Sequence, residues 1–549
     1  MKRIRVHTVR LPLEEPDAYV EALAKKLKLE IEDLKDVVLV KRTLDARKAP
    51  VWNCSIDVSI PSNARSPKSS DPAPDPLLFA RKSYKVRKFE RIVIIGAGPC
   101  GLFAANMLAE HGLNPILLDR GDPVEVRARK VSRLMHHGEL DPESNICYGE
   151  GGAGTWSDGK LYTRIKDKRC RHVLETIVEL GGPERILVDG KPHLGTNRLV
   201  ALCKAFRARL TDLGAEVRFQ SRVIGLQIKS GQIEGVKLSD GTLIEASRVI
   251  LAVGHSARDM YTLLDQNGIK MEAKPFAVGF RVEHKQELIN QIQYGPFAYS
   301  EGIPSADYRL ATNFETPKGR VGVYSFCMCP GGQVVPSHTR KEEICVNGMS
   351  HASRKGHYAN SALVVAVNEN DFATVKPGPG GDLFSGMRFQ EEAEKKAYAL
   401  GGGGFFAPAQ KLQDFVDAKV STDVLKSTYK PGIVSADLSQ CYPLPVIEKL
   451  REALKRFDES MPGYLTNDAS IIGVETRTSA PMRILRNDRL QSVSCGGLYP
   501  SGEGAGYGGG IVSAAVDGLK VAEQILIELS DGYVYKEASQ RKTYEKTFY

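Results

Sequence analysis

Three glycines at fixed spacing follow an apolar run and open a helical pattern in the segment IVIIGAGPCGLFAANMLAEHG. Gly96 allows a tight turn, Gly98 lets the backbone approach a pyrophosphate, and Gly101 lets a helix pack closely on a strand. Free N–H groups and the dipole at the start of that helix favour an anion. The next apolar run ends at Asp119, 18 residues after Gly101, where a carboxylate can accept both ribose hydroxyls of an adenosine. This unit predicts a dinucleotide site whose contacts are Gly96, Ala97, Gly98, Pro99, Cys100, Gly101, Asp119 and Arg120.

Three later segments suit a cofactor longer than NAD, because FAD carries a flavin and a ribityl chain to which more of the protein must return. They are Gly149–Leu161 (GEGGAGTWSDGKL), Ser247–Gly254 (SRVILAVG) and Gly496–Gly510 (GGLYPSGEGAGYGGG). Glu503 is placed to bind ribityl hydroxyls, and the helix that follows is placed to point its N-terminus at the flavin. We therefore expect bound FAD, with further contacts from Gly152, Ala153, Gly154, Thr155, Ser157, Asp158, Val223, Ala252, Gly254, Gly502, Glu503, Gly510 and Ile511.

A separate nicotinamide domain is not expected, because no second GxGxxG follows a strand and opens a helix. The segment Gly401–Gly404 has four glycines without that context. If NAD(P)H reduces the flavin, it must therefore dock transiently in the substrate region.

Charged side chains next to the glycine-rich segments are the catalytic candidates. Lys160 could place a cation near the N1 or N5 edge of the flavin, although a lysine after a turn also suits the surface. Arg477 and Arg483 lie in GVETRTSAPMR, shortly before the last glycine-rich segment, and could clamp a carboxylate or a phosphate. The same loop also suits a surface turn. Arg281 and Arg354 are similar candidates from the substrate region.

Thiols and imidazoles of the substrate region add weaker candidates. Cys327 and Cys329 form a CxC, a spacing that would strain a disulfide and make it redox-labile. In a strand the two would share one face, and buried thiols without a redox role are the common alternative. No Cys or His spacing predicts a metal site. The possible acids and bases, each of which also suits a surface or core position, are His284, His338, His351 and His357.

The chain divides where its composition changes. The first 60 residues alternate like strands around one helical segment. Pro61–Pro76, with five prolines and four serines, is expected to hold no regular element. We predict an α/β fold with a discontinuous Rossmann-like FAD-binding domain, an inserted mixed α+β substrate domain and a small N-terminal α+β domain. The expected ranges are 1–60 (N-terminal accessory domain), 61–88 (Pro/Ser-rich linker), 89–270 (first part of the FAD-binding domain), 271–465 (substrate domain) and 466–549 (return to the FAD-binding domain).

The composition is that of an ordinary folded protein: 549 residues, 42% hydrophobic and 26% charged, which excludes a disordered chain, a coiled coil or a fibre. A net charge of +9 over this length permits anionic ligands without requiring nucleic acid. Ten scattered cysteines without a CxxC pair fit a reducing compartment, and no apolar run predicts a signal peptide or a membrane span. We expect a cytoplasmic protein with a small-molecule substrate; the oligomeric state stays open.

Several of these segments together resemble known flavoproteins. IVIIGAGPCGLFAA with LLDRG, SRVILAVG and GLYPSGEGAGYGGGIVSAAVDG resemble FAD-dependent oxidoreductases of the glutathione-reductase-like superfamily. RTLDAR, GEGGAGTWSDGKL, PFAVGFRVEH, SFCMCPGG, NGMS and GVETRTSAPMRI are similar to a family of poorly characterised bacterial FAD-dependent dehydrogenases, over nearly the whole chain. The resemblance implies bound FAD and leaves the substrate open. Asp119 departs from the superfamily pattern, which more often has Glu, and either carboxylate can bind ribose.

The residues and the resemblance predict an FAD-dependent oxidoreductase that transfers a hydride between flavin N5 and an unidentified small organic substrate. Two alternatives stay open. The basic segments and the small N-terminal unit could hold RNA for a flavin-dependent modification. A flavin-binding sensor without turnover would have the same cofactor site.

Overall fold

The computed structural model describes residues 1–73, 82–317, 319–372, 375 and 377–535. Residues 74–81 of the expected linker and 536–549 of the last expected range lie outside the described residues. Within the described ranges, none of the helices combines the length and the apolar character that crossing a bilayer requires.

The N-terminal unit is an antiparallel sheet in the order β2-β3-β1-β4, with one helix packed on it. A bulge in β1 places Thr8 in the left-handed region and shifts the register between Val6 and Val9. Both valines therefore stay in the core although their spacing breaks the strand alternation. The elements are β1 (Lys2–Leu11), α1 (Tyr19–Leu27), β2 (Lys35–Asp45), β3 (Val51–Ile60) and β4 (Ser70–Pro72).

The short strand β4 corrects the expectation that Pro61–Pro76 holds no regular element. Ser70–Pro72 pairs antiparallel with β1 at the edge of the sheet. A proline is compatible with an edge strand because only one side of that strand has to hydrogen-bond to a neighbour.

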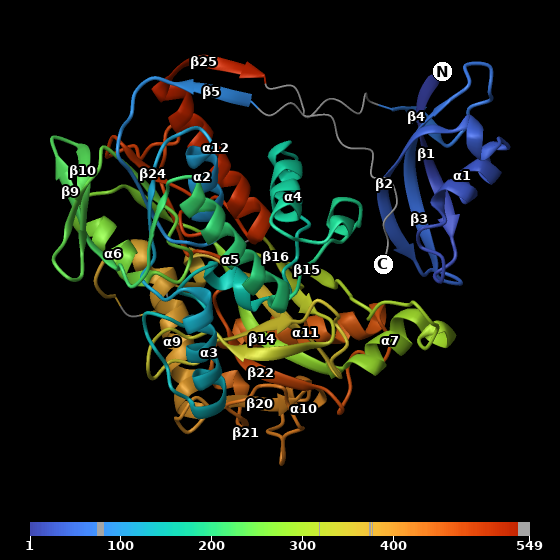
Figure 1. Cartoon of the computed structure of the whole chain (residues 1–549). Coiled ribbons are helices and arrows are strands. Elements are labelled where there is room, and N and C mark those ends of the chain that lie inside the picture. The colour runs from blue at the N-terminus through green and yellow to red at the C-terminus, as the bar shows by residue number, and fades with distance from the viewer. Residues whose placement is uncertain (74–81, 318, 373–374, 376, 536–549) are drawn as a thin grey trace.

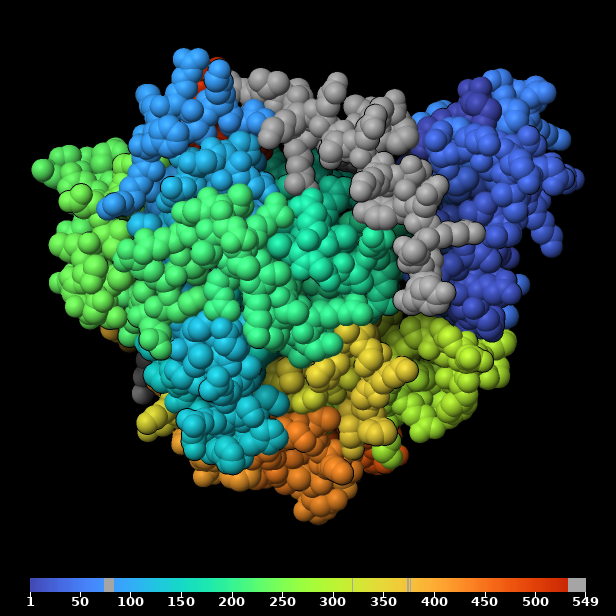
Figure 2. All heavy atoms as spheres, viewed as in Figure 1, coloured from blue at the N-terminus to red at the C-terminus, as the bar shows by residue number. Residues whose placement is uncertain are grey.

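The N-terminal unit forms a lobe of its own, blue in Figures 1 and 2, and docks on the rest of the chain at two places. Arg42 exchanges backbone hydrogen bonds with Val188 and Gly190, both at 2.8 Å, and its guanidinium pairs with Asp189 at 3.1 Å. Gly302 lies against the backbone of Leu13. The short helical turn η3 (Glu184–Leu187) directly precedes the segment that contacts Arg42.

A five-stranded parallel sheet in the order β24-β12-β6-β7-β8 carries the glycine-rich loop. Along its central strand, Ile92 and Ile94 face one core while Val93 and Ile95 face another. Burial on both faces explains the continuous apolar run in the sequence. The strands are β6 (Ile92–Ile95), β7 (Ile116–Leu118), β8 (Glu216–Arg218), β12 (Arg248–Leu251) and β24 (Leu498–Pro500).

Helices cover one face of the parallel sheet, and a three-stranded meander with one helix covers the other. The helices α2 and α12 lie side by side (Figure 1), and Gly518 packs directly on the backbone of Cys100. The first face carries α2 (Pro99–Ala109), α4 (Arg169–Glu179), α5 (Thr196–Asp212) and α12 (Ile511–Leu529). The second carries β9 (Val223–Lys229), β10 (Gln232–Leu238), β11 (Leu243–Glu245) and α6 (Arg258–Gln266), while α3 (Val124–His137) follows β7.

A seven-stranded mixed sheet in the order β15-β16-β19-β14-β22-β20-β21 forms the second large layer. Its pairs are antiparallel except β20 with β21. Along β14, Val278, Phe280 and Val282 face the largest core, while Ala277 belongs to a small cluster on the opposite face. The strands are β14 (Phe276–Lys285), β15 (Ala311–Thr316), β16 (Gly319–Cys329), β19 (Tyr358–Val367), β20 (Ala407–Lys411), β21 (Ile433–Ser435) and β22 (Ser470–Glu475).

Helices and small ribbons complete this layer. The helices are α7 (Gln286–Tyr294), α8 (Glu369–Phe372), α9 (Ser385–Leu400), α10 (Leu412–Val416) and α11 (Leu444–Ser460). The two-stranded ribbons pair β17 (Gly332–Pro336) with β18 (Val346–Ser350), β13 (Met271–Ala273) with β23 (Met482–Ile484), and β5 (Lys82–Val86) with β25 (Ser530–Tyr535).

The molecule is thus a mixed α/β protein with a Rossmann-type parallel sheet, as the sequence predicts. The seven-stranded sheet extends past residue 465, because β22 runs from Ser470 to Glu475 within it. The five expected domain ranges themselves stay a prediction.

Candidate cofactor and active site

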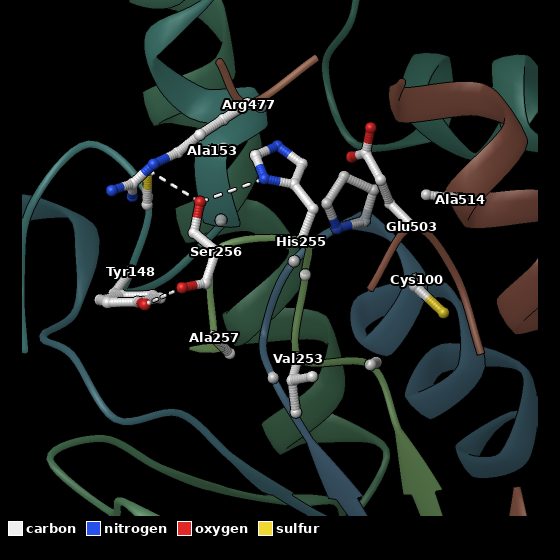
Figure 3. A pocket seen from close by; sticks show the side chains of 18 of the residues that line it. Cys100, Tyr148, Ala153, Val253, His255, Ser256, Ala257, Arg477, Glu503 and Ala514 are labelled. Carbon is white, nitrogen blue, oxygen red and sulfur yellow. Dashed lines mark hydrogen bonds between the residues drawn. The ribbon is translucent and has the colours of Figure 1, made fainter. Parts of the chain in front are cut away.

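A cavity lies at the carboxyl ends of β6, β7 and β12, between the parallel sheet and the seven-stranded sheet. The carboxyl ends of parallel strands are where open α/β sheets bind ligands. Segments distant in sequence meet there, as Figure 3 shows for part of the wall. Most residues expected at the site line it: Gly96, Gly98, Pro99, Cys100, Asp119, Arg120, Gly152, Ala153, Gly154, Ser157, Asp158, Lys160, Val223, Ala252, Gly254, Arg477, Glu503, Gly510 and Ile511.

Four of the expected FAD contacts and the loop residue Arg483 are not part of the cavity wall, and neither are Arg281 and Arg354. The four FAD contacts are each within one residue of a lining residue in the sequence: Ala97, Gly101, Thr155 and Gly502. The N–H of Ala97, for example, donates to Asp119, and a side chain at Gly101 would overlap the carbonyl of Gly96. Arg483 lies away from the cavity, where it forms an exposed ion pair with Glu272 at 3.0 Å. Because β23 pairs with β13, the loop turns Arg483 outward.

Two glycine backbones approach each other in the middle of the cavity wall. A Cβ added to Gly152 would lie 3.1 Å from the Cα of Gly98, a distance tighter than ordinary side-chain contacts. The N–H of Gly151 donates to the carbonyl of Ala97 at 2.8 Å and fixes the two loops together. The result is a cradle of bare backbone.

Two helices begin at the cavity. Gly98 caps α2, whose first residue is Pro99, and Gly510 caps α12, whose first residue is Ile511. The first-turn N–H groups of a helix have no partner within the helix and attract anions. The cavity wall therefore offers two sites for negative charge, one at the cradle and one at the start of α12.

Asp119 lies at the end of β7 with both carboxylate oxygens in use. Oδ2 accepts the N–H of Ala97 at 2.8 Å, and Oδ1 accepts the N–H of Gly121 at 2.9 Å. The carboxylate thereby fixes the glycine-rich loop, and Asp119 also lines the cavity with acceptor capacity to spare.

Arg127 on α3 organises the loop that carries Gly152, and the sequence did not reveal it. Its side chain is fully buried. The guanidinium donates to the carbonyls of Asn145 and Ile146 at 2.8 Å each, Glu150 at 2.5 Å and Gly152 at 2.9 Å. It also lies over the ring of Trp156. One buried cation therefore holds the backbone of loop 145–152 in place at several carbonyls.

A closed ring of ion pairs lines one end of the cavity. Arg120 pairs with Glu143 at 2.7 Å and with Asp259 at 3.0 Å, and Arg222 pairs with the same two acids at 3.0 and 2.9 Å. Arg120 also lies 4.4 Å above the ring of Tyr148. Burial opposes the charge of Asp259, but the two arginines outweigh it and lower its pKa. The two positive and two negative charges of this ring therefore neutralise each other at this end of the cavity.

A second ion-pair group lies at the end of the cavity formed with the seven-stranded sheet. Asp158 is 3% exposed and accepts from Arg354 and Ser350. Lys160 Nζ lies 3.2 Å from Asp158 and donates to the carbonyl of Met328. Burial opposes both charges, but the pairing dominates: the pKa of Asp158 is lowered and that of Lys160 is raised. Lys160 is thus a fixed cation at the cavity wall.

Arg477 reaches the cavity wall but is fully engaged in a buried network. It donates to Glu394 at 2.7 and 3.0 Å, to Thr339 at 2.9 Å and to Glu343 at 3.2 Å. Arg258 pairs with the same two acids. Arg477 therefore fixes the wall, and the neighbouring Thr478 adds a hydroxyl to the lining.

The histidine at the cavity is His255, not one of the four expected from the substrate region. His284 hydrogen-bonds to the carbonyl of Tyr464 and His338 stacks on Phe405, and neither lines the cavity, nor do His351 and His357. His255 follows β12, and its Nδ1 lies 3.1 Å from the hydroxyl of Ser256 (Figure 3). Burial lowers its pKa, which favours the neutral ring. In the described ranges, no group of three or more His, Cys, Asp and Glu side chains is arranged to hold a metal ion.

Family models match three parts of the chain. The model described as an FAD binding domain matches residues 90–133, and the model described as an FAD-dependent protein, C-terminal domain-like, matches residues 275–478. Residues 3–59 match a domain of unknown function. The chain therefore carries an FAD-binding domain, and the glycine-rich loop and Asp119 lie within it.

Relatives match either the whole chain or only part of it. An uncharacterized protein of Clostridium beijerinckii is 41% identical over 544 residues, which is 95% of this chain and 98% of that protein. A thiamine thiazole synthase of Methanococcus vannielii is 27% identical over 187 residues, 32% of this chain and 60% of that protein. Among solved structures, CtdE in complex with FAD has a TM-score of 0.30 at 11% identity, covering 80% of this chain and 88% of that one. L-proline dehydrogenase from P. horikoshii has a TM-score of 0.32 at 13% identity, covering 81% and 96%. Likeness at this level leaves the reaction open.

Proposed function

We propose that this chain, which belongs to the same family as the Clostridium beijerinckii protein, is an FAD-dependent oxidoreductase of the dehydrogenase type, acting on a small organic substrate. The observation that carries the proposal is the single cavity that runs from the glycine cradle and Asp119 to the polar wall around Lys160. A cavity with a phosphate cradle at one part and a fixed cation at another suits a long redox dinucleotide placed beside a substrate.

The residues present fit FAD. The bare backbone of Gly98 and Gly152 would hold the pyrophosphate against the N-terminus of α2. Asp119 would accept from the adenosine ribose, and Glu503 would accept from the ribityl chain. The first turn of α12 would face the flavin. Its dipole would stabilise a negative charge there by about 0.3–1 kcal/mol, or ~2 kcal/mol in a partly buried setting.

FAD supplies the hydride chemistry when bound. The chain supplies orientation and charge. Lys160, held by Asp158 and by the carbonyl of Met328, keeps a cation at a fixed place on the wall. Phe326 on β16 and Asn347 on β18 bring an aromatic face and an amide to the same cavity. A substrate that lies between this wall and the cofactor would be enclosed by both sheets, which excludes water.

The experiment is a titration of the purified protein with FAD, followed by anaerobic reduction with candidate substrates. We expect a yellow protein with one FAD per chain, and bleaching of the flavin by a substrate of the right class. NADH and NADPH belong to the panel, because a transiently docking nicotinamide stays a prediction. Colourless protein that ignores added FAD would overturn the proposal.

A matched pair of variants tests the role of the fixed cation. Lys160→Met is expected to keep FAD and to lower the rate of flavin reduction at least tenfold, since one charge-assisted contact contributes roughly 1.5–3 kcal/mol. Lys355→Met removes an exposed lysine outside the cavity and is expected to change neither. Equal reduction rates in the two variants would exclude Lys160 from the reaction.

A further inference from the structure

We infer that Cys327 and Cys329 form a dithiol that exchanges two electrons with the bound flavin, so that a small dithiol or disulfide is a second substrate class. This inference rests on the proposed function, because it requires FAD in the cavity. Both cysteines line that cavity, close to Lys160.

A bulge in β16 brings the two cysteines together. Phe326 is opposite Ala362 and Cys329 is opposite Asn360, so three steps along β16 cover the length of two steps along β19. A regular strand rises about 3.3 Å per residue, so two residues span about 6.6 Å, which lies within the 4.4–6.8 Å between Cα atoms that a disulfide requires. The extra residue shortens β16 further at this point. The backbone of Cys327, within the bulge, adopts the left-handed conformation, with a φ of 47°. This geometry replaces the expectation that the two side chains lie on one face of a regular strand.

Two buried cations hold the bulge. Arg281 donates to the carbonyl of Cys327 at 2.8 Å and lies 3.5 Å from Cys329 Sγ, while Lys160 donates to the carbonyl of Met328 between the two cysteines. Arg281 is itself fixed by Glu475 at 2.8 Å and Asn360 at 2.8 Å. A left-handed non-glycine residue costs of order 1–3 kcal/mol and persists only where its surroundings enforce it. Here four elements enforce it next to the cofactor cavity.

The two thiols differ in access, as thiol exchange requires. Cys327 is solvent-exposed within the cavity although protein atoms surround it densely, and Cys329 is buried with its Sγ 3.2 Å from the carbonyl of Cys327. Burial raises the pKa of Cys327 to about 12 and also raises that of Cys329, so both rest as thiols at neutral pH. Cys327 is therefore the sulfur that an external thiol or disulfide can reach, and Cys329 is the partner that resolves the exchange.

The S–H bonds of Cys327 and Cys329 break and one S–S bond forms. The two electrons released pass to the bound FAD, the oxidant, together with the two protons, one of which can leave through solvent. A small dithiol then reduces the Cys327–Cys329 disulfide by exchange and departs as a disulfide, which restores both thiols. The same steps run in the reverse direction when reduced flavin and a small disulfide are supplied.

The experiment counts electrons in the FAD-loaded protein. The holoprotein is oxidised with diamide, desalted, and titrated anaerobically with dithionite while the flavin absorbance is followed. We expect about four electrons per FAD in the native protein, two for the disulfide and two for the flavin, and about two in Cys327→Ser and in Cys329→Ser. Cys170→Ser, on α4 and outside the cavity, is the matched control and should take about four, like the native protein.

Peptide mass spectrometry of the alkylated, diamide-treated protein gives a readout that does not depend on the flavin. A peptide with an internal Cys327–Cys329 bond supports the inference. A native protein that takes up only about two electrons, with both cysteines alkylated, overturns it while leaving the proposed function intact. A protein that binds no FAD overturns the proposed function and with it the flavin coupling, and the peptide result then shows whether the pair oxidises alone.

Discussion

Arg127 should control both the stability of this protein and its affinity for FAD. The change we consider is Arg127→Met, which keeps a long apolar stem and removes every donor. Four carbonyls of loop 145–152 lose a hydrogen bond of 2.5–2.9 Å from a buried cation. Hydrogen bonds to charged groups contribute about 1.5–3 kcal/mol each, but water that enters the gap will satisfy some of the carbonyls. Removing one partner of a buried charge network costs about 3–5 kcal/mol, and we expect a loss of that size.

The assay separates the two effects. Thermal unfolding of the apoprotein should begin ~6–20 °C lower, because 1 kcal/mol shifts the midpoint by about 2–4 °C in a domain of 150–250 residues. Titration with FAD should show affinity reduced by at least tenfold, since the loop that carries Gly152 no longer holds its position against Gly98. The control is Arg129→Met, two residues along the same helix and exposed, where we expect changes within about 0.5 kcal/mol.

Three outcomes would bear directly on this reasoning. Wild-type affinity and an unchanged midpoint in Arg127→Met would refute it, because the Glu150 carbonyl alone among the four accepts from a second side chain, Thr155 at 3.3 Å, in the described hydrogen bonds. A lower midpoint with unchanged affinity would show that the loop finds its position when the cofactor binds. Partial recovery in Arg127→Lys would show that charge, more than the forked geometry, holds the loop.

Three further predictions follow from single contacts. Asp119→Ala should weaken FAD binding by about 10–100-fold, measured by quenching of flavin fluorescence. It should also lower the thermal unfolding midpoint of the apoprotein, because the N–H of Ala97 loses its acceptor. Unchanged FAD affinity would show that Asp119 does not bind the cofactor. Gly504→Ala should lower FAD affinity because the new Cβ would overlap the carbonyl of Gly254, whereas Gly509→Ala meets open space and should bind normally; equal binding would contradict the packing argument. Burial lowers the pKa of His338 to about 3, so the unfolded chain, with an ordinary pKa near ~6.5, takes up a proton that the folded chain refuses. The stability from this group is therefore complete above about pH 6.5 and is lost as the pH falls below it, by up to ~1.4 kcal/mol per pH unit; urea unfolding from pH 7.5 to 5 should show a smaller slope in His338→Phe, and equal slopes would contradict the assignment.

The sequence predicted those parts of the site that depend on local chain geometry. The loop from Gly96 to Gly101 lies between one strand and one helix, so its three glycines carry the whole signal within a few residues. A Cβ at Gly96 or Gly101 would overlap backbone, which leaves only glycine at both positions. His255 also has a local signal. It follows Gly254 after the buried strand β12, and the carboxyl end of such a strand is where a parallel sheet presents its functional groups.

Arg127 and the cysteine bulge carry no comparable signal. The partners of Arg127 are backbone carbonyls, which every residue has, so no side-chain pattern marks them. Within α3 it is one of several basic residues, and only burial distinguishes it from the exposed Arg129. Arg483 shows the converse: a loop position next to the last glycine-rich segment suggested the site, but one strand pairing turned the side chain away.

The bulge in β16 follows from the same physics. Strand alternation would put Cys327 and Cys329 on one face, and only the pairing with β19 shows where the extra residue enters. The residues that fix it come from β14, β19, β22 and the loop after η2 (Gly152–Trp156), far apart in sequence. Lys160 is common to both features: it belongs to the ion-pair group of Asp158 and it holds the bulge. Replacing it with Met should therefore disturb the two thiols as well as the fixed charge, whereas a change in Cys329 alone should leave the charge in place, so comparing the two variants separates hydride transfer from thiol exchange.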